Sequence, residues 1–161
     1  MIKLYIADLA EYSSGRLVGK WFELDDYNCY EDLENDITEM LSENGNEEWA
    51  IHDYEADFPI SEYEDLETLF DIMELMEEYS EEHVSACIDY FGKDNLQTEI
   101  EDTYFYEDMT LEEYAIQDAN EKFEQDNVSY FYQDHFDYES YAVTLGTQGY
   151  NEVCGGVLIT E

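Results

Sequence analysis

The sequence predicts an α+β protein built as an elongated chain of three small units. Segments near both ends have the aromatic and branched composition of strands. The middle of the chain instead repeats apolar residues at the three- and four-residue spacing of helices. The only proline, Pro59, marks a boundary between the first unit and the middle. We expect an N-terminal α+β unit at 1–60, an acidic helical unit at 61–102 and a mixed α+β C-terminal unit at 103–161.

The N-terminal unit is predicted to contain an antiparallel sheet with a helix. Residues 2–9 and 17–24 have strand composition, and the Ser-Ser-Gly turn between them favours a hairpin. Apolar residues recur at helical spacing over 33–41, and Gly45 just beyond them suits the end of a helix. Residues 49–54 have the composition of a third strand.

The middle unit is predicted to be helical. Ser61 and Glu64 have the spacing of a helix capping box. An apolar stripe follows, with Asp and Glu on the other face, and this pattern is typical of an amphipathic helix. A second helix is predicted at 81–91, ended by Gly92. The stripe of the first helix consists of Tyr63, Leu66, Leu69, Phe70, Met73 and Met76.

In the C-terminal unit, Thr110 and Glu113 have the spacing of another capping box, which predicts that a helix begins there. Residues 130–143 are rich in aromatic side chains and are left without an assignment. Residues 153–159, interrupted by two glycines, are predicted to form a terminal strand. The inward face of the predicted helix carries Leu111, Tyr114, Ala115, Ala119 and Phe123.

Charge is the most unusual property of the chain, which has 44 Asp and Glu against 5 Lys and Arg and a net charge of −39. Disordered acidic chains are poor in aromatic residues, whereas this one has 16 Tyr, 8 Phe and 2 Trp and is expected to fold. Anionic membranes and nucleic acids would repel it, so we expect no membrane and no direct nucleic-acid binding. Any electrostatic partner should have a basic surface.

Motifs for catalysis are missing from the sequence. Close pairs of carboxylates arise by chance in so acidic a chain, and the scattered histidines and cysteines lack metal-site spacing. We therefore expect no enzyme activity, no catalytic residues, no metal and no cofactor. No signal-peptide pattern is visible, and the three widely separated cysteines suit reduced thiols, so a cytoplasmic location is expected.

The charge is comparable with that of a nucleic acid. Duplex DNA has one negative charge per ~1.7 Å of axis, so 39 charges correspond to about 66 Å of duplex. A compact chain of this length would be only ~40 Å across, so units placed end to end would approach the charge density of DNA. From composition alone, DNA mimicry, adaptation to high salt and an acidic interaction module remain open.

Three segments resemble the ArdA antirestriction proteins, a family carried by mobile elements and phages. The first is LYIADL at 4–9, continued by Tyr12, Gly15, LVG at 17–19 and Trp21. The second is EEWAIHDYE at 47–55, followed by FPI at 58–60 and by Glu62 and Tyr63. The third, FDYESYA at 136–142 with GGV at 155–157, is the weakest of the three.

This resemblance implies an elongated, three-part α+β molecule that forms a homodimer and imitates bent B-form DNA. Such proteins occupy the DNA-binding groove of type I restriction-modification enzymes, so that restriction, and sometimes modification, is blocked. The expected partner is therefore such an enzyme, through its specificity and modification subunits. The alternative is an acidic interaction module or a halophile-type acidic domain that binds a basic protein surface.

Two groups of residues are expected to carry this function. Carboxylates on the middle and C-terminal units would take the place of DNA phosphates, and aromatic residues near the C-terminus would form the dimer interface. The phosphate-mimicking set is Glu62, Glu64, Asp65, Glu67, Asp71, Glu74, Glu77, Glu78, Glu81, Glu82, Glu112, Glu113, Asp118, Glu121 and Glu124. The interface set is Tyr130, Phe131, Tyr132, Phe136, Tyr138 and Tyr141.

Overall fold

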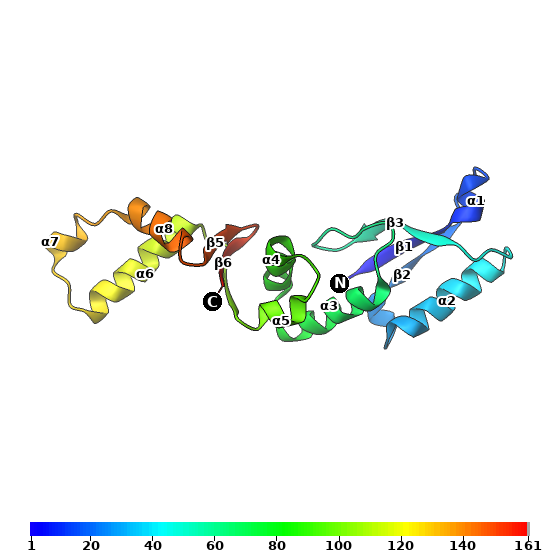
Figure 1. The fold of residues 1–161 in the computed structure, drawn as a ribbon, viewed down its shortest axis with the longest axis horizontal. Coiled ribbons are helices and arrows are strands. Elements are labelled where there is room, and N and C mark those ends of the chain that lie inside the picture. Colours follow the sequence, from blue (N-terminus) through cyan, green and yellow to red (C-terminus); the bar gives the residue numbers. More distant parts are fainter. Residues whose placement is uncertain (161) are drawn as a thin grey trace. The chain divides into compact units, whose positions relative to one another are not determined.

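An antiparallel sheet organises each half of the chain, and helices accompany both sheets (Figure 1). The computed structural model describes residues 1–160. Contacts along the chain divide it into two units, residues 1–79 and 80–161. The predicted α+β class, with a sheet and helix first and mixed strands and helices last, is confirmed. The predicted division into three units stays a prediction.

The first sheet has the strand order β2–β1–β3. Both neighbours run antiparallel to the central strand, and the register shifts between Tyr5 and Ile6, where β3 carries one extra residue. On the outer face, Lys3 Nζ lies 3.0 Å from a Glu23 oxygen and 3.7 Å from a Glu55 oxygen. The strands are β1 (Lys3–Asp8), β2 (Gly19–Glu23) and β3 (Trp49–Glu55).

The first two strands pair as the predicted hairpin, but a short helix, α1 (Leu9–Ser13), lies in the connection. Asp8 causes this difference, because its carboxylate accepts a hydrogen bond from the Glu11 amide (3.1 Å) and caps the helix. It also accepts one from the Asn46 side chain at 2.8 Å. Burial alone would raise the pKa of Asp8, but these hydrogen bonds outweigh it and the pKa is lowered.

Two amphipathic helices complete the first unit, and the short 3₁₀ segment η1 (Leu24–Asp26) precedes them. In Figure 1, α2 (Tyr30–Ser42) runs alongside the sheet. It buries Leu33, Ile37 and Leu41, in agreement with the predicted spacing. The other helix, α3 (Leu66–Glu78), buries Leu66, Leu69, Ile72 and Leu75.

The predicted start of the middle helix at Ser61 is wrong. Glu64 does accept a hydrogen bond from the Ser61 amide (3.0 Å), but the two residues form a turn before the helix. Asp65 is the true N-cap, since its carboxylate accepts hydrogen bonds from the amide and hydroxyl of Thr68 at 3.0 Å. Tyr63 therefore lies outside the helix and is 69% exposed, not part of the buried stripe.

The second sheet has the order β4–β6–β5, with antiparallel pairing throughout. The strand predicted at 153–159 is in fact a hairpin, because Gly155 turns the chain with a positive φ of 84°. The strands β4 and β5 were not predicted. The elements are α4 (Glu81–Phe91), α5 (Leu96–Ile100), β4 (Thr103–Glu107), α6 (Leu111–Gln125), α7 (Tyr130–Gln133), α8 (Tyr138–Gly146), β5 (Tyr150–Val153) and β6 (Gly156–Thr160).

The predicted capping box at Thr110 is confirmed, and both of its reciprocal hydrogen bonds to Glu113 are present. The helix that it opens, α6, packs against α8 and the sheet. Leu111 and Phe123, predicted to face inward, are only partly buried. The core of this part consists of Tyr114, Ala115, Ala142, Leu145 and Val157.

A buried polar cluster connects α4 to β4. Thr103 donates its hydroxyl hydrogen to the carbonyl of Ile100 (2.8 Å), so its oxygen acts as the acceptor for His83 Nε2, also at 2.8 Å. The neutral imidazole of His83 thus carries its hydrogen on Nε2. Cys87 Sγ lies 3.6 Å from the same oxygen. Burial lowers the pKa of His83, because it disfavours the charged ring.

We predict that this histidine makes the second unit less stable in mild acid. Because the pKa of His83 is lower in the folded state, the unfolded chain binds more protons once the pH falls below its ordinary value of about 6.5. His83→Gln keeps a side-chain donor for Thr103 but does not titrate. The wild-type advantage in unfolding free energy over this variant should therefore shrink between pH 7.5 and 5.5, measured by urea denaturation. An advantage that stays constant over this range would contradict the prediction.

Candidate functional site

Both units carry a large excess of negative charge. Residues 1–79 contain 24 acidic and 3 basic side chains, and residues 80–161 contain 20 and 2. Several of these basic groups are held by local partners: Lys3 by Glu23 and Glu55, Arg16 by Glu11, and Lys122 by Asp118. The acid is therefore a property of the folded units and not of a tail.

The predicted carboxylates of α3 form an exposed face opposite the buried one. Glu67, Asp71, Glu74 and Glu78 are separated by four, three and four residues, which places them in one stripe. With Glu77, the helix has five exposed carboxylates in 13 residues, or about one per ~4 Å at a rise of 1.5 Å per residue. A single DNA strand has one phosphate per ~3.4 Å of duplex axis.

Other predicted residues of the middle segment differ in their surroundings. Glu62, Glu81 and Glu82 are exposed. Glu64 is half-buried and Asp65 is exposed, and both have the local hydrogen bonds described above. The set therefore combines side chains displayed to solvent with side chains that hold the backbone in place.

The predicted carboxylates of α6 are also mixed in character. Glu113 belongs to the capping box, and hydrogen bonds from the Thr110 amide and hydroxyl lower its pKa. Asp118 is half-buried, lies 2.7 Å from Lys122 Nζ and accepts a hydrogen bond from the Tyr141 hydroxyl. The remaining members, Glu112, Glu121 and Glu124, are exposed.

An acidic face that the sequence reasoning missed lies on α2. Like α3, this helix has five exposed carboxylates and no basic residue. The helical spacing of its apolar residues could have revealed this acidic face. Carboxylates of both helices raise the pKa of Tyr30: the charge of Glu31 of α2 is the main cause, and that of Glu67 of α3 is the next. The α2 carboxylates are Glu31, Asp32, Glu34, Asp36 and Glu39.

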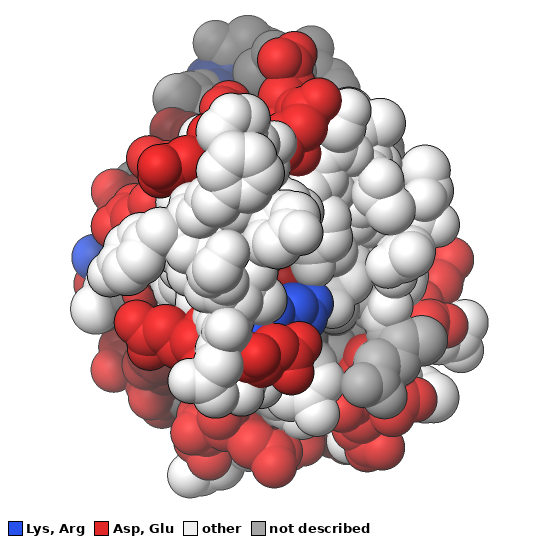
Figure 2. Space-filling model, turned by 90° about the vertical axis from the view of Figure 1, so that its left-hand side faces the viewer, with Lys and Arg blue, Asp and Glu red and all other residues white. Residues whose placement is uncertain are grey.

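The residues predicted for the dimer interface fall into two groups. Tyr130, Phe131 and Tyr132 of α7 are 81%, 66% and 67% exposed. The other three are partly buried around Phe136, whose ring centroid lies 5.1 Å from that of Tyr138 and 5.4 Å from that of Tyr141. Figure 2 shows this end of the second unit, where uncharged side chains gather and Asp and Glu surround them.

Within residues 1–160 there is no group of three or more His, Cys, Asp or Glu side chains placed to hold a metal ion. The helices of the same range include none that is long and apolar enough to cross a bilayer. The exposed carboxylates are thus the main chemical feature of the surface, and they suit the binding of cationic groups.

We predict that the acidic face of α3 is destabilising at low salt. The triple variant Asp71→Asn, Glu74→Gln and Glu78→Gln removes like-charge pairs at helical spacing and should raise Tm by roughly 2–5 °C at low salt. At about 1 M NaCl, where charges are screened within ~3 Å, the gain should disappear. As a matched control, Asp65→Ala removes the N-cap and should cost about 1 kcal/mol at either salt concentration. A gain in Tm that persists at high salt would show that charge repulsion is not its cause.

The sequence of the chain matches one known protein family. A search of curated proteins finds no match to this chain. A family model described as antirestriction protein (ArdA) matches residues 4–158. This family acts against restriction, which implies interaction with restriction enzymes, and it is not a known enzyme family. Since the match covers nearly the whole sequence, the chain belongs to the ArdA family of antirestriction proteins.

Proposed function

We propose that this protein inhibits type I restriction-modification enzymes by occupying their DNA-binding groove in place of DNA. Membership of the family establishes an antirestriction protein. The proposal adds the class of enzyme, contact with its specificity and modification subunits, and imitation of DNA as the mechanism. It also makes the protein a stoichiometric inhibitor with no catalytic activity, acting in the cytoplasm where the enzyme meets incoming DNA.

The exposed carboxylate faces of α2 and α3 carry the proposal. Each helix has five acidic side chains in 13 residues and no basic one, at a spacing along its axis close to that of phosphates along one DNA strand. A groove that binds DNA has to be cationic, and such a groove would attract these helices over a long range. The second unit has exposed carboxylates of its own on α4 and α6.

A distributed field predicts that inhibition is lost gradually. Individual exposed ion pairs contribute about 0.2–1 kcal/mol each, so Glu74→Gln should weaken binding less than about fivefold. The triple variant of α3 should weaken it by roughly 3- to 100-fold, measured as displacement of labelled DNA from a type I enzyme in a gel-shift competition. Circular dichroism serves to verify that each variant is folded.

Two outcomes would contradict this mechanism. One is a single neutralisation that abolishes inhibition while the protein remains folded. The other is equal displacement of DNA from an unrelated cationic DNA-binding protein, because this result would indicate a general acidic interaction module.

We further propose that the protein is a homodimer that associates through α7 and its surroundings. Tyr130, Phe131 and Tyr132 are three consecutive exposed aromatic residues on one short helix, and the ring centroids of Phe131 and Tyr132 lie 5.6 Å apart. Val143 of α8 is also 67% exposed. Contiguous exposed apolar surface of this kind marks an interaction site more often than a free surface. Because each copy carries the same negative charge, association should strengthen as salt screens the repulsion.

Sedimentation velocity at micromolar concentration measures this association. The wild type should sediment as a dimer, and the variant with Tyr130, Phe131 and Tyr132 all replaced by Ser should sediment as a monomer. Tyr104→Ser is the matched control, since it removes an exposed aromatic ring (59%) from the same unit but not from this helix, and it should remain dimeric. A wild type that is only monomeric at both low and high salt would contradict the proposal.

A further inference from the structure

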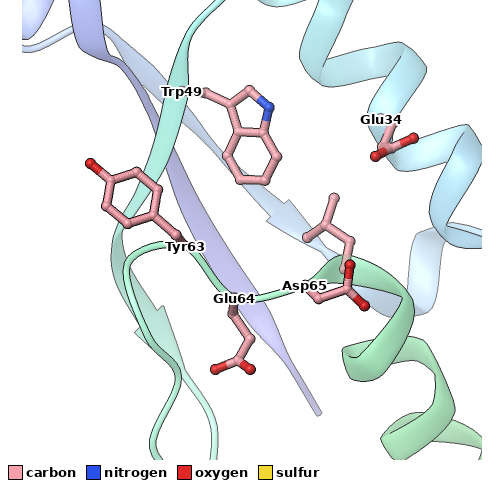
Figure 3. A pocket seen from close by; sticks show the side chains of 6 residues that line it. Glu34, Trp49, Tyr63, Glu64 and Asp65 are labelled. Carbon is pink, nitrogen blue, oxygen red and sulfur yellow. The ribbon is translucent and has the colours of Figure 1, made fainter.

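A small hollow in the first unit combines aromatic rings with carboxylates. Its volume is about 290 Å³, which is room for about ten water molecules at ~30 Å³ each. Figure 3 shows the Trp49 indole and the Tyr63 phenol on two sides of this space, with the Glu34 carboxylate facing it from α2. The lining consists of Glu34, Trp49, Tyr63, Glu64, Asp65 and Leu66.

The wall that carries Trp49 is held by the sheet. Trp49 begins β3, where it lies opposite Asp8 in the register with β1. The loop before it is fixed at two points: the Leu9 amide donates to the Glu48 carbonyl (3.0 Å), and the side chain of Asn46 donates to buried Asp8 (2.8 Å). The backbone that carries the indole is therefore held in place by the fold.

The opposite wall, residues 63–65, is also fixed. The Ile51 amide of β3 donates to the Glu62 carbonyl at 2.9 Å, which holds this segment against the edge of the sheet. The N-cap of Asp65 fixes the start of α3, and the buried side chain of Leu66 anchors it in the core. A site with such preformed walls loses little conformational entropy on binding.

The chemistry of the lining selects a flat organic cation. Indole and phenol rings attract cations over their faces, and the carboxylates of Glu34 and Asp65 add negative charge and acceptor oxygens. The Glu64 carboxylate points away from the indole in Figure 3 and accepts the Ser61 amide. Asp65 uses one oxygen for its bonds from Thr68, and a carboxylate has about four lone-pair sites. Among the described residues, none that lines the hollow is basic. Anions are therefore repelled.

We propose that this hollow binds the guanidinium group of an arginine side chain. Guanidinium is planar, stacks on aromatic faces and donates paired hydrogen bonds to carboxylates, whereas the lysine ammonium is a compact and strongly hydrated charge. The arginine belongs to the protein partner that the acidic surface binds. This identity rests on the proposed function, but the guanidinium chemistry of the hollow does not. The site would give one directional contact within an otherwise diffuse electrostatic interface.

Fluorescence of Trp49 tests the chemistry directly. The chain has two tryptophans, so Trp21→Phe leaves Trp49 as the single indole reporter. Titration with argininamide at constant ionic strength should give a saturable change in emission, and lysinamide and spermidine should bind at least threefold more weakly. An unsaturable response, or equal affinity for the ammonium compounds, would overturn the guanidinium assignment.

A pair of variants on one helix localises the site. In the Trp21→Phe background, Glu34→Gln should weaken argininamide binding by about 3- to 10-fold, as expected for loss of a partly exposed charged contact. Glu39→Gln removes the same charge from α2 but does not line the hollow, and its effect should be less than twofold. Equal effects of the two variants would mean that only the general negative field binds the cation.

The same pair separates this inference from the proposed function. In the DNA competition assay, Glu34→Gln should weaken inhibition about threefold more than Glu39→Gln. If argininamide binds as expected but the two variants inhibit equally, the partner's arginine does not use the hollow and that assignment is overturned. If the wild type does not compete with DNA at all, the proposed function fails, whereas saturable binding of argininamide would still establish the guanidinium site.

Discussion

Each element of this protein has to bury apolar side chains while leaving nearly all of its carboxylates in water. Burying an ionised carboxylate without partners costs several kcal/mol, which would offset the burial of about two or three apolar side chains. On α3, for example, Glu74 is therefore exposed while its neighbour Leu75 is buried. The main exception is Asp8, which is 1% exposed and is accepted because Asn46 and the backbone of α1 supply donors. The acidic surface is thus a direct result of how the chain folds.

The negative charge of this surface raises the pKa of nearby tyrosine side chains. The charge of Glu62 is the main cause of the raised pKa of Tyr63, as Glu31 is for Tyr30. Tyr27 shows a second mechanism: burial comes first, and the hydrogen bond from its hydroxyl to Asp36 (2.8 Å) comes next, raising its pKa to about 12. These phenols stay neutral near pH 7 and contribute hydrogen bonds and packing without further charge. A protein that attracts cationic surfaces gains from aromatic residues of this kind, because they supply apolar contact at no electrostatic cost.

Local sequence patterns predicted the helix ends correctly where only one capping or stop residue was present nearby. The capping box at Thr110 and the helix ended by Gly92 are present as expected, but Asp65 displaced the predicted start at Ser61, since an aspartate next to the apolar run is a better N-cap. The strand β4 was missed because its pairing partner β6 is some 50 residues away. The acidic face of α3 was predictable from periodicity, and that of α2 could have been found in the same way. The hollow beside Trp49 was beyond such reasoning, because three separate segments meet there only in the folded unit.

Trp49 has a further significance, because it also lines a second hollow of about 450 Å³ with residues from the end of α2 and the loop that follows it. Trp49 is thus a lining residue of both hollows. A smaller side chain at this position would enlarge both of them toward the size that accommodates small organic molecules, about 300–1,000 Å³. An artificial ligand could then be seated between the sheet and α2, providing a chemical handle to control the inhibitor from outside its acidic surface.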